Sequence, residues 1–327
     1  MANINTFLLR DTLVDDGKAV HHQYDSSPDL ICYPQVMDPQ TFFTDNYGSD
    51  VTRAVDKNSR TNPLYVRGKN MTGSPLQGRI QVYRACFSLF MTPSIWRNNK
   101  LYTAPVDDDP PFDYVSFSAA SNGIAVGEAP FVIDGTQGNF CLVGIASDNA
   151  GPVIPPDFDS YDKFIQWVTS NPGVCVRNQS VRAIGQRADM ELAARIMNPE
   201  DIIKEGFLQV KVESMPTGTT LTARNTALQY EYEYKTVQTD DGFVSEVPIP
   251  PHFDGFFTGT VQAPGPIPSN AKFTMIYYYI LPPDSPVYHL GTAAEALLAD
   301  TKGGEVALQT LVGRMLVRLG SCTIQAQ

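Results

Sequence analysis

The chain of 327 residues has no cluster of Lys and Arg, no apolar run of 18 residues and no close pair of cysteines. A nucleic-acid-binding surface needs a basic face, and a net charge of -11 does not supply one, so we expect no nucleic-acid partner. A membrane-spanning helix needs about 20 apolar residues in succession, so we also expect no membrane span.

The five cysteines are widely spaced, and no two of them form a CxxC motif. Structural zinc sites usually take their ligands from close pairs, which this spacing does not provide. Cys86 and Cys141 lie within apolar, strand-like runs, so we predict buried, reduced thiols and no obligatory disulfide. The complete set is Cys32, Cys86, Cys141, Cys175 and Cys322.

Sequence motifs of catalysis are also missing. The chain contains no G-x-S-x-G nucleophile turn, no Walker loop and no dinucleotide glycine motif. His252 and His289 lie beside prolines in expected loops, and a pair of catalytic carboxylates cannot be recognised from spacing alone. We therefore predict a protein that is not an enzyme, with a metal-dependent hydrolase as an alternative.

The first residues, "MANINTFLLRD", do not form a basic segment followed by an apolar one. A Sec signal peptide needs both. We predict cytoplasmic synthesis without a Sec signal, with non-classical release as the alternative for a secreted protein.

Turn-forming residues, in contrast, are abundant. The 25 Pro and 24 Gly are spread along the chain, and they separate short strand-like runs in both halves. The run "QYEYEYK" alternates tyrosine with acid and is the clearest half-buried strand. This pattern predicts an all-β fold of two tandem Ig-like β-sandwich domains, residues 1–187 and 188–327, separated near a polar stretch at 185–205.

Only a few segments favour helix. Phe164, Trp167 and Val168 have i, i+3, i+4 spacing and predict one short helix at residues 160–169. "GTAAEALLAD" near the carboxyl terminus predicts another, whereas "LVGRMLVRLGSCTI" is compatible with helix or strand. We expect these helices to be peripheral.

Tyrosines are concentrated in "MIYYYILPP". Alternate side chains of a strand point to opposite faces, so an outward tyrosine could contact a protein or carbohydrate. A second layer that covers all of them is the alternative.

Several motifs of the first half recur in a known pattern. "RDTLVDDG" precedes "SPDLICYP", and "NPLYVRGKNMTGSPLQGRIQVYRA" and "SIWRNN" follow in order. Over about residues 8–185 this resembles an Ig-like β-sandwich module of bacterial proteins, akin to the cell-adhesion-related domain found in bacteria. The resemblance implies a β-sandwich and says little about function, because such modules are attached to many different proteins. The second half resembles only a generic sandwich.

The stretch of residues 10–34 combines aspartates, His21 and His22. A calcium loop needs oxygen ligands at alternate positions, a spacing that Asp11, Asp15 and Asp16 do not reproduce. Adjacent histidines of an extended chain point to different faces, which disfavours a shared transition metal. We therefore expect turn chemistry and structural pairing here, with calcium as the alternative.

A second acidic cluster, "VDDDPPFD", spans residues 106–113. Its prolines favour an extended, exposed loop from which several acids could converge on calcium. Simple solvation of the charges is the alternative. The candidate metal ligands are Asp107, Asp108, Asp109 and Asp113.

These observations favour a non-enzymatic binding or structural protein that presents tandem β-sandwiches to a protein or carbohydrate partner. A protein partner or self-association is the expected mode. The alternative is a secreted toxin or effector exported without a Sec signal. A pore-forming toxin would need a mobile Ser/Thr-rich hairpin, for which "TGTTLTARNTALQ" at 217–229 is the only mild candidate.

Overall fold

The computed structural model describes most of the chain and divides it into two compact units. The described residues are 6–17, 24–105, 110–137, 139–147, 154–179, 181–182, 188–298 and 312–326. The first unit consists of Met1–Ala85, Thr92–Asp157 and Gln166–Val181. The second consists of Cys86–Met91, Phe158–Ile165 and Arg182–Gln327. The expected boundary between residues 187 and 188 stays a prediction, because 183–187 lie outside the described residues.

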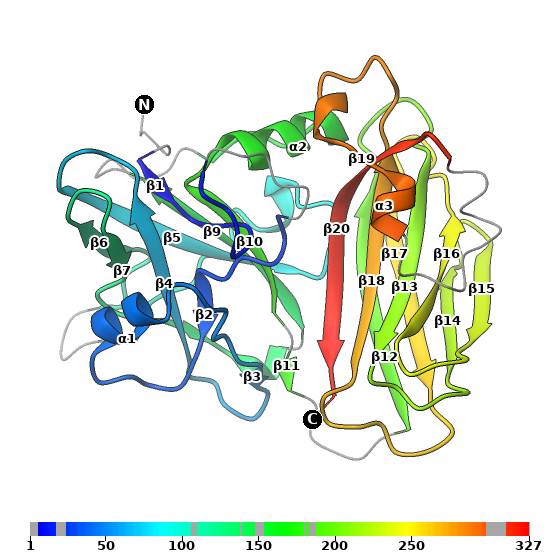
Figure 1. The fold of residues 1–327 in the computed structure, drawn as a ribbon, viewed down its shortest axis with the longest axis horizontal. Coiled ribbons are helices and arrows are strands. Elements are labelled where there is room, and N and C mark those ends of the chain that lie inside the picture. Colours follow the sequence, from blue (N-terminus) through cyan, green and yellow to red (C-terminus); the bar gives the residue numbers. More distant parts are fainter. Residues whose placement is uncertain are drawn as a thin grey trace. The chain divides into compact units, whose positions relative to one another are not determined.

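Antiparallel sheets make up both units, which confirms the all-β sandwich prediction (Figure 1). The described residues contain three short α-helices: α1 (Pro39–Asp45), α2 (Tyr161–Ser170) and α3 (Ala294–Leu298). α2 and α3 form where helix was predicted. The seven-residue α1 was missed; Asp38 caps it by accepting a hydrogen bond from Thr41 N at 3.1 Å. Single 3-10 turns are η1 (Pro93–Ile95), η2 (Gly135–Gln137) and η3 (Tyr288–Leu290).

The first unit has one sheet built around a long strand, β4, and a second sheet facing it. β4 (Asn62–Asn70) pairs with β1 (Phe7–Leu8), β2 (Leu30–Cys32), β7 (Ile124–Val126) and β8 (Phe131–Ile133). The second sheet has the order β10 (Val174–Gln179), β9 (Phe140–Ser147), β5 (Leu76–Cys86) and β6 (Val115–Ala119). The short strands β3 (Val55–Asp56) and β11 (Val181–Arg182) pair with each other. Leu64, Ile80 and Leu142 belong to the common apolar core, so burial of both inner faces holds this sandwich together.

The second unit also contains two sheets. One has the order β12 (Asp189–Met197), β17 (Asp254–Gln262), β14 (Thr220–Asn225) and β15 (Tyr230–Lys235). The other has the order β16 (Asp241–Glu246), β13 (Gly206–Glu213), β18 (Lys272–Ile280), β20 (Met315–Gln325) and β19 (Thr292–Ala293). The ambiguous carboxyl-terminal segment is therefore a strand. The candidate pore hairpin contributes β14, which is hydrogen-bonded to strands on both sides.

β12 lies within residues 185–205, the polar stretch expected to separate the two domains. Its inward residues Leu192, Ala194 and Ile196 are buried, while Glu191 and Ala193 are exposed. Alanine on both faces weakens the alternation of apolar and polar residues, so the sequence shows no clear period of two here.

All three tyrosines of β18 are buried, which confirms the covered alternative. Tyr277 donates its hydroxyl hydrogen bond to Val247 O at 2.9 Å, and Tyr278 donates to Gln209 Oε1 at 3.1 Å. The ring of Tyr279 lies edge-on to Tyr161, with 5.3 Å between centroids. These side chains support the core and form no outward contact surface.

Candidate functional site

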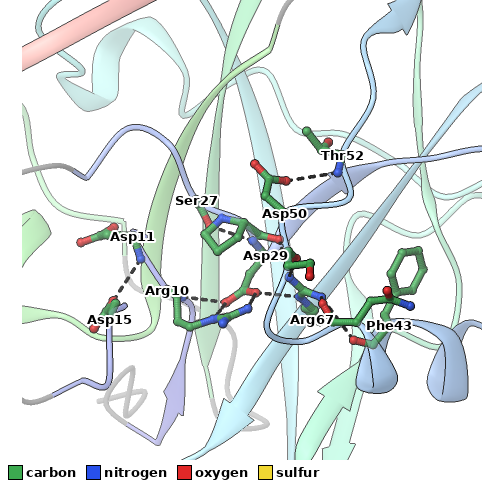
Figure 2. Close-up of polar contacts among 12 residues, drawn as sticks. Arg10, Asp11, Asp15, Ser27, Asp29, Phe43, Asp50, Thr52 and Arg67 are labelled. Atoms are coloured by element: carbon green, nitrogen blue, oxygen red, sulfur yellow. Dashed lines mark hydrogen bonds and ion pairs between the residues drawn. The ribbon is translucent and has the colours of Figure 1, made fainter. Parts of the chain in front are cut away.

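Two buried arginines of the first unit, Arg10 and Arg67, bind the carboxylate of Asp29. Asp29 follows "SP" in the sequence and lies just before β2. Figure 2 shows the Arg10 and Arg67 side chains pointing at its carboxylate. Oδ2 accepts from Arg10 N (2.8 Å) and Arg10 Nε (3.1 Å). Oδ1 accepts from Arg10 Nη2 (2.7 Å) and Arg67 Nε (2.9 Å). Each carboxylate oxygen thus accepts two charge-assisted bonds, so Asp29 is engaged structurally and is not a general base.

Arg67, in β4, is fully buried and uses every donor of its guanidinium. Besides its Nε bond to Asp29, it donates only to backbone carbonyls, one just before β2 and three in or just after α1. These acceptors are the carbonyls of Pro28, Phe43, Asn46 and Ser49. Burial lowers the pKa of Arg67, but an arginine stays charged under such a shift. The residue is therefore a structural tie between β4, β2 and the α1 segment.

Tyr47 covers the two guanidinium groups. Its ring centroid lies 3.5 Å from Cζ of Arg10 and 5.2 Å from Cζ of Arg67. Burial opposes the charge of Arg10, but the hydrogen bonds and the charge of Asp29 outweigh it and raise the pKa of Arg10. An aromatic face and a carboxylate together stabilise two cations that have almost no access to water.

The neighbouring aspartates form the expected turn. Asp15 Oδ1 accepts from Gly17 N at 2.8 Å and its Oδ2 accepts from Asp11 N at 3.0 Å. Gly17 has φ +76°, a left-handed conformation that favours glycine. His21 and His22 lie outside the described residues. The structure thus supports turn chemistry for the described part of the stretch.

Asp11 is the unusual member of this group. It is buried, and its Oδ1 has no hydrogen-bond partner. Burial, followed by the charges of Asp15, Asp25 and Asp29, raises its pKa well above the usual range. Within the described residues, however, no three Asp, Glu, His or Cys side chains have the geometry of a metal site. The raised pKa is explained by burial and like charge.

Asn70, the last residue of β4, completes the set of motif residues. Its amide donates to Ser74 O at 2.8 Å and Ala120 O at 2.9 Å, and its Oδ1 accepts from Thr72 N at 2.8 Å. The residues of "RDTLVDDG", "SPDLICYP" and "NPLYVRGKN" that are described above therefore fix loops and strands to one another. The motifs are signals of the fold.

Only one of the candidate calcium ligands lies in the described part of the chain. Asp107, Asp108 and Asp109 are outside it. Asp113 Oδ2 forms an ion pair with Lys100 Nζ at 2.5 Å and accepts from Gln81 Nε2 at 3.5 Å. The calcium site stays a prediction, with Asp113 already paired to a cation.

None of the five cysteines forms a disulfide, and four are buried. Burial raises the pKa of Cys32 to about 12, so its thiolate is not accessible near neutral pH. Cys141 is buried as predicted. Cys86 is exposed, and the prediction was wrong for this residue: it is the last residue of β5, where the alternation that buries Ala85 turns Cys86 outward.

The histidine with a carboxylate partner lies in an exposed loop. His252 Nε2 is 2.7 Å from Asp201 Oδ1, and the two side chains are 65% and 93% exposed. Solvent on this scale screens the pair, so the geometry does not resemble a desolvated catalytic dyad.

The candidate interface is the outer edge of β15, which Figure 1 shows as the last strand of its sheet. The opposite edge of this sheet, β12, is covered: Arg195 N donates to Phe87 O at 2.9 Å, and Leu89 N donates to Arg195 O at 2.7 Å. β15 pairs with β14 on one side, and no described strand pairs with its other side. Among the described residues, one edge of this four-stranded sheet is thus covered and the other has no strand partner.

Main-chain hydrogen bonds show which groups of β15 face outward. Just beyond the strand, Thr236 N donates to Thr219 O and Gly218 N donates to Thr236 O, both at 2.9 Å. Thr236 therefore directs its main chain toward β14. Because this direction alternates along an antiparallel strand, the N–H and C=O groups of Glu231, Glu233 and Lys235 point away from the sheet.

The two faces of β15 differ in chemistry, as the alternation "YEYEYK" predicted. The tyrosines face the opposing sheet: the ring centroid of Tyr232 lies 4.6 Å from that of Phe243. Tyr232 is still 38% exposed because it lies at the edge. Glu231, Glu233 and Lys235 are exposed on the outer face. The alternation predicted the two faces but not the position at the edge, since strand order depends on long-range pairing.

No protein-family model matches the chain, and no curated protein matches it. Among solved structures, a red sea bream transglutaminase aligns over 90% of this chain at 9% identity, with TM-score 0.20. The chain spans only 34% of that protein. The collagen-binding domain of the Erysipelothrix rhusiopathiae surface protein RspB aligns over 84% of this chain. The calcium-binding domain CBD12 of CALX1.1 aligns over 83%. Each match has 10% identity and TM-score 0.17. The alignments cover 94% and 96% of those two chains. Matches with such low TM-scores do not support a fold assignment, so the fold is assigned from the observed β-sheets alone.

Among the described residues, no helix has the length and apolar character needed to cross a membrane.

Proposed function

We propose that this chain is a non-enzymatic binding or structural protein that engages a protein partner by adding the partner's strand to β15. The open edge carries this proposal: three residues direct their main-chain donors and acceptors away from the sheet, while the opposite edge is covered. An extended partner can satisfy these groups with backbone hydrogen bonds, which supply affinity in strand addition.

The state of the buried charged groups supports a binding role. Asp29 and Arg67, the most buried charges, have complete sets of structural hydrogen bonds. A group whose bonds are all used by the fold cannot transfer a proton without breaking that fold. The resemblance of residues 8–185 to an adhesion-related module agrees with this proposal and gives no partner.

A proline in β15 tests the proposal. Glu233 directs its N–H outward, so Glu233→Pro removes a donor of the free edge and leaves the bonds to β14 in place. Glu233→Gln is the matched control, because it removes the same charge and retains the N–H. The probe is a displayed library of randomised extended segments, selected on the wild type.

We expect the selected segments to bind the wild type and Glu233→Gln and to lose binding to Glu233→Pro. Circular dichroism of the proline variant should match that of the wild type, showing that the sheet is retained. Segments that bind Glu233→Pro as well as the wild type would refute strand addition at this edge.

A further inference from the structure

The side chains of β15 determine which strand can pair there. Their outer face presents Glu231, Glu233 and Lys235 at alternate positions, all exposed. Residues directly opposite on neighbouring strands lie close enough for charges to attract or repel. On the side of β14, Glu231 lies opposite Arg224, whereas Glu233 and Lys235 lie opposite threonines. The side away from β14 leaves room for a complementary strand.

From this pattern we infer that the occupant of the β15 edge is an antiparallel segment with the order acid–apolar–base–apolar–base. This inference depends on the proposed function. Every strand pair of this sheet is antiparallel, so the amino-terminal acid of the segment lies opposite Lys235 and its two bases lie opposite Glu233 and Glu231. With a base opposite Glu231, charges alternate across three strands, from Arg224 through Glu231 to the partner.

The apolar positions follow from the other face. They lie on the side of Tyr232 and Tyr234, whose rings already contact Phe243. An apolar side chain there covers the exposed part of Tyr232 and extends the aromatic layer.

A second copy of β15 does not provide this order. Antiparallel pairing centred on Glu233 places that carboxylate opposite itself. Pairing centred on Tyr234 places Glu231 opposite Val237, whose N–H already donates to Asp241 Oδ2 at 2.7 Å. The net charge of -11 also opposes association between copies. A foreign segment with two bases fits better than the chain itself.

Charges on an edge strand also discourage pairing with arbitrary strands. The same charges could protect the edge against arbitrary pairing or select one kind of partner strand. These two roles differ in outcome, because protection alone would not rank segments by the order of their charges.

The experiment compares two synthetic peptides of identical composition, one with the order acid–apolar–base–apolar–base and one with base–apolar–acid–apolar–base. The second peptide places its acid opposite Glu233 in either strand direction. Binding is measured by titration calorimetry, and the site is mapped by amide hydrogen exchange of Glu231, Glu233 and Lys235. We expect the first peptide to bind roughly tenfold more tightly and to protect these amides.

A charge-reversed strand provides the rescue. The variant Glu231→Lys, Glu233→Lys, Lys235→Glu should prefer a peptide with the order base–apolar–acid–apolar–acid over the original one. Its substitutions lie on the exposed face, but Glu231→Lys places a second cation opposite Arg224, so we expect a small fall in melting temperature.

The outcomes separate the two proposals. Equal affinity of the isomeric peptides, with the three amides protected, would overturn the charge order and leave strand addition intact. If the chain alone forms a dimer that is lost in Glu233→Pro, the occupant is a second copy and not a foreign segment, and the edge is still an interface. Failure of every peptide to protect these amides would overturn both the inference and the proposed function.

Discussion

Removing the Asp29 carboxylate should destabilise the first unit strongly. Asp29→Ala leaves Arg10 and Arg67 as buried cations, 3% and 0% exposed, without the anion that receives four of their hydrogen bonds. Removing one partner of a buried ion pair costs about 3–5 kcal/mol in the free energy of unfolding. For a unit of this size we expect a fall in melting temperature of roughly 2–4 °C per kcal/mol.

The assay is urea unfolding followed by tryptophan fluorescence, since Trp96 and Trp167 both lie in the first unit. Asp113→Ala is the matched control in the same unit. The Asp113–Lys100 pair is 33% exposed on each side, so its loss should cost about 1 kcal/mol or less. A loss for Asp29→Ala no larger than that of the control would refute the burial argument.

An apolar replacement tests the reason for the loss. Buried ion networks can often be replaced by apolar residues without destabilisation. Here Arg67 also donates to four backbone carbonyls, which a methionine would leave without that donor. The triple variant Arg10→Met, Asp29→Leu, Arg67→Met should therefore remain destabilised. Wild-type stability in this variant would show that the carbonyl bonds contribute little.

Three further predictions concern individual groups. The pKa of Asp11 is raised in the folded state, so its contribution to stability is complete below its unfolded pKa of about 3.9 and is lost as pH rises through the folded value. Urea titration should therefore show that Asp11→Asn is more stable than the wild type at pH 7 and equal to it at pH 3.5. Cys86 is the exposed thiol, so a thiol reagent should modify one cysteine quickly in the native chain, and rapid modification of several would contradict the described burial. Because Asp113 is already paired with Lys100, we expect the wild type to have equal melting temperatures in calcium and in chelator. A calcium-dependent rise in melting temperature that is absent from the variant Asp107→Ala, Asp109→Ala would place the ion at the acidic loop.

Local patterns predicted much of the secondary structure. Alternation in "QYEYEYK" correctly separated the inward tyrosines from the outward acids, and the spacing of Phe164, Trp167 and Val168 predicted α2. β12 was missed because alanine lies on both of its faces. The pattern of apolar residues therefore works best where the two faces of an element differ most.

Local sequence patterns did not predict which residues far apart in the chain contact each other. Asp29 lies 19 residues from Arg10 and 38 from Arg67, and these groups meet because β1 and β2 both pair with β4. The open edge likewise depends on sheet order. β14 separates β15 from β17, and residues 87–89 cover β12, so neither end of the sheet can be identified from local spacing.

Amide hydrogen exchange along β15 tests the central claim most directly. In the free protein, we predict rapid exchange at Glu231, Glu233 and Lys235 and slow exchange at Tyr232 and Tyr234, whose N–H groups face β14. A selected extended segment should slow the first three selectively. Slow exchange at all five in the free protein, or no change at the first three when the segment binds, would contradict the account.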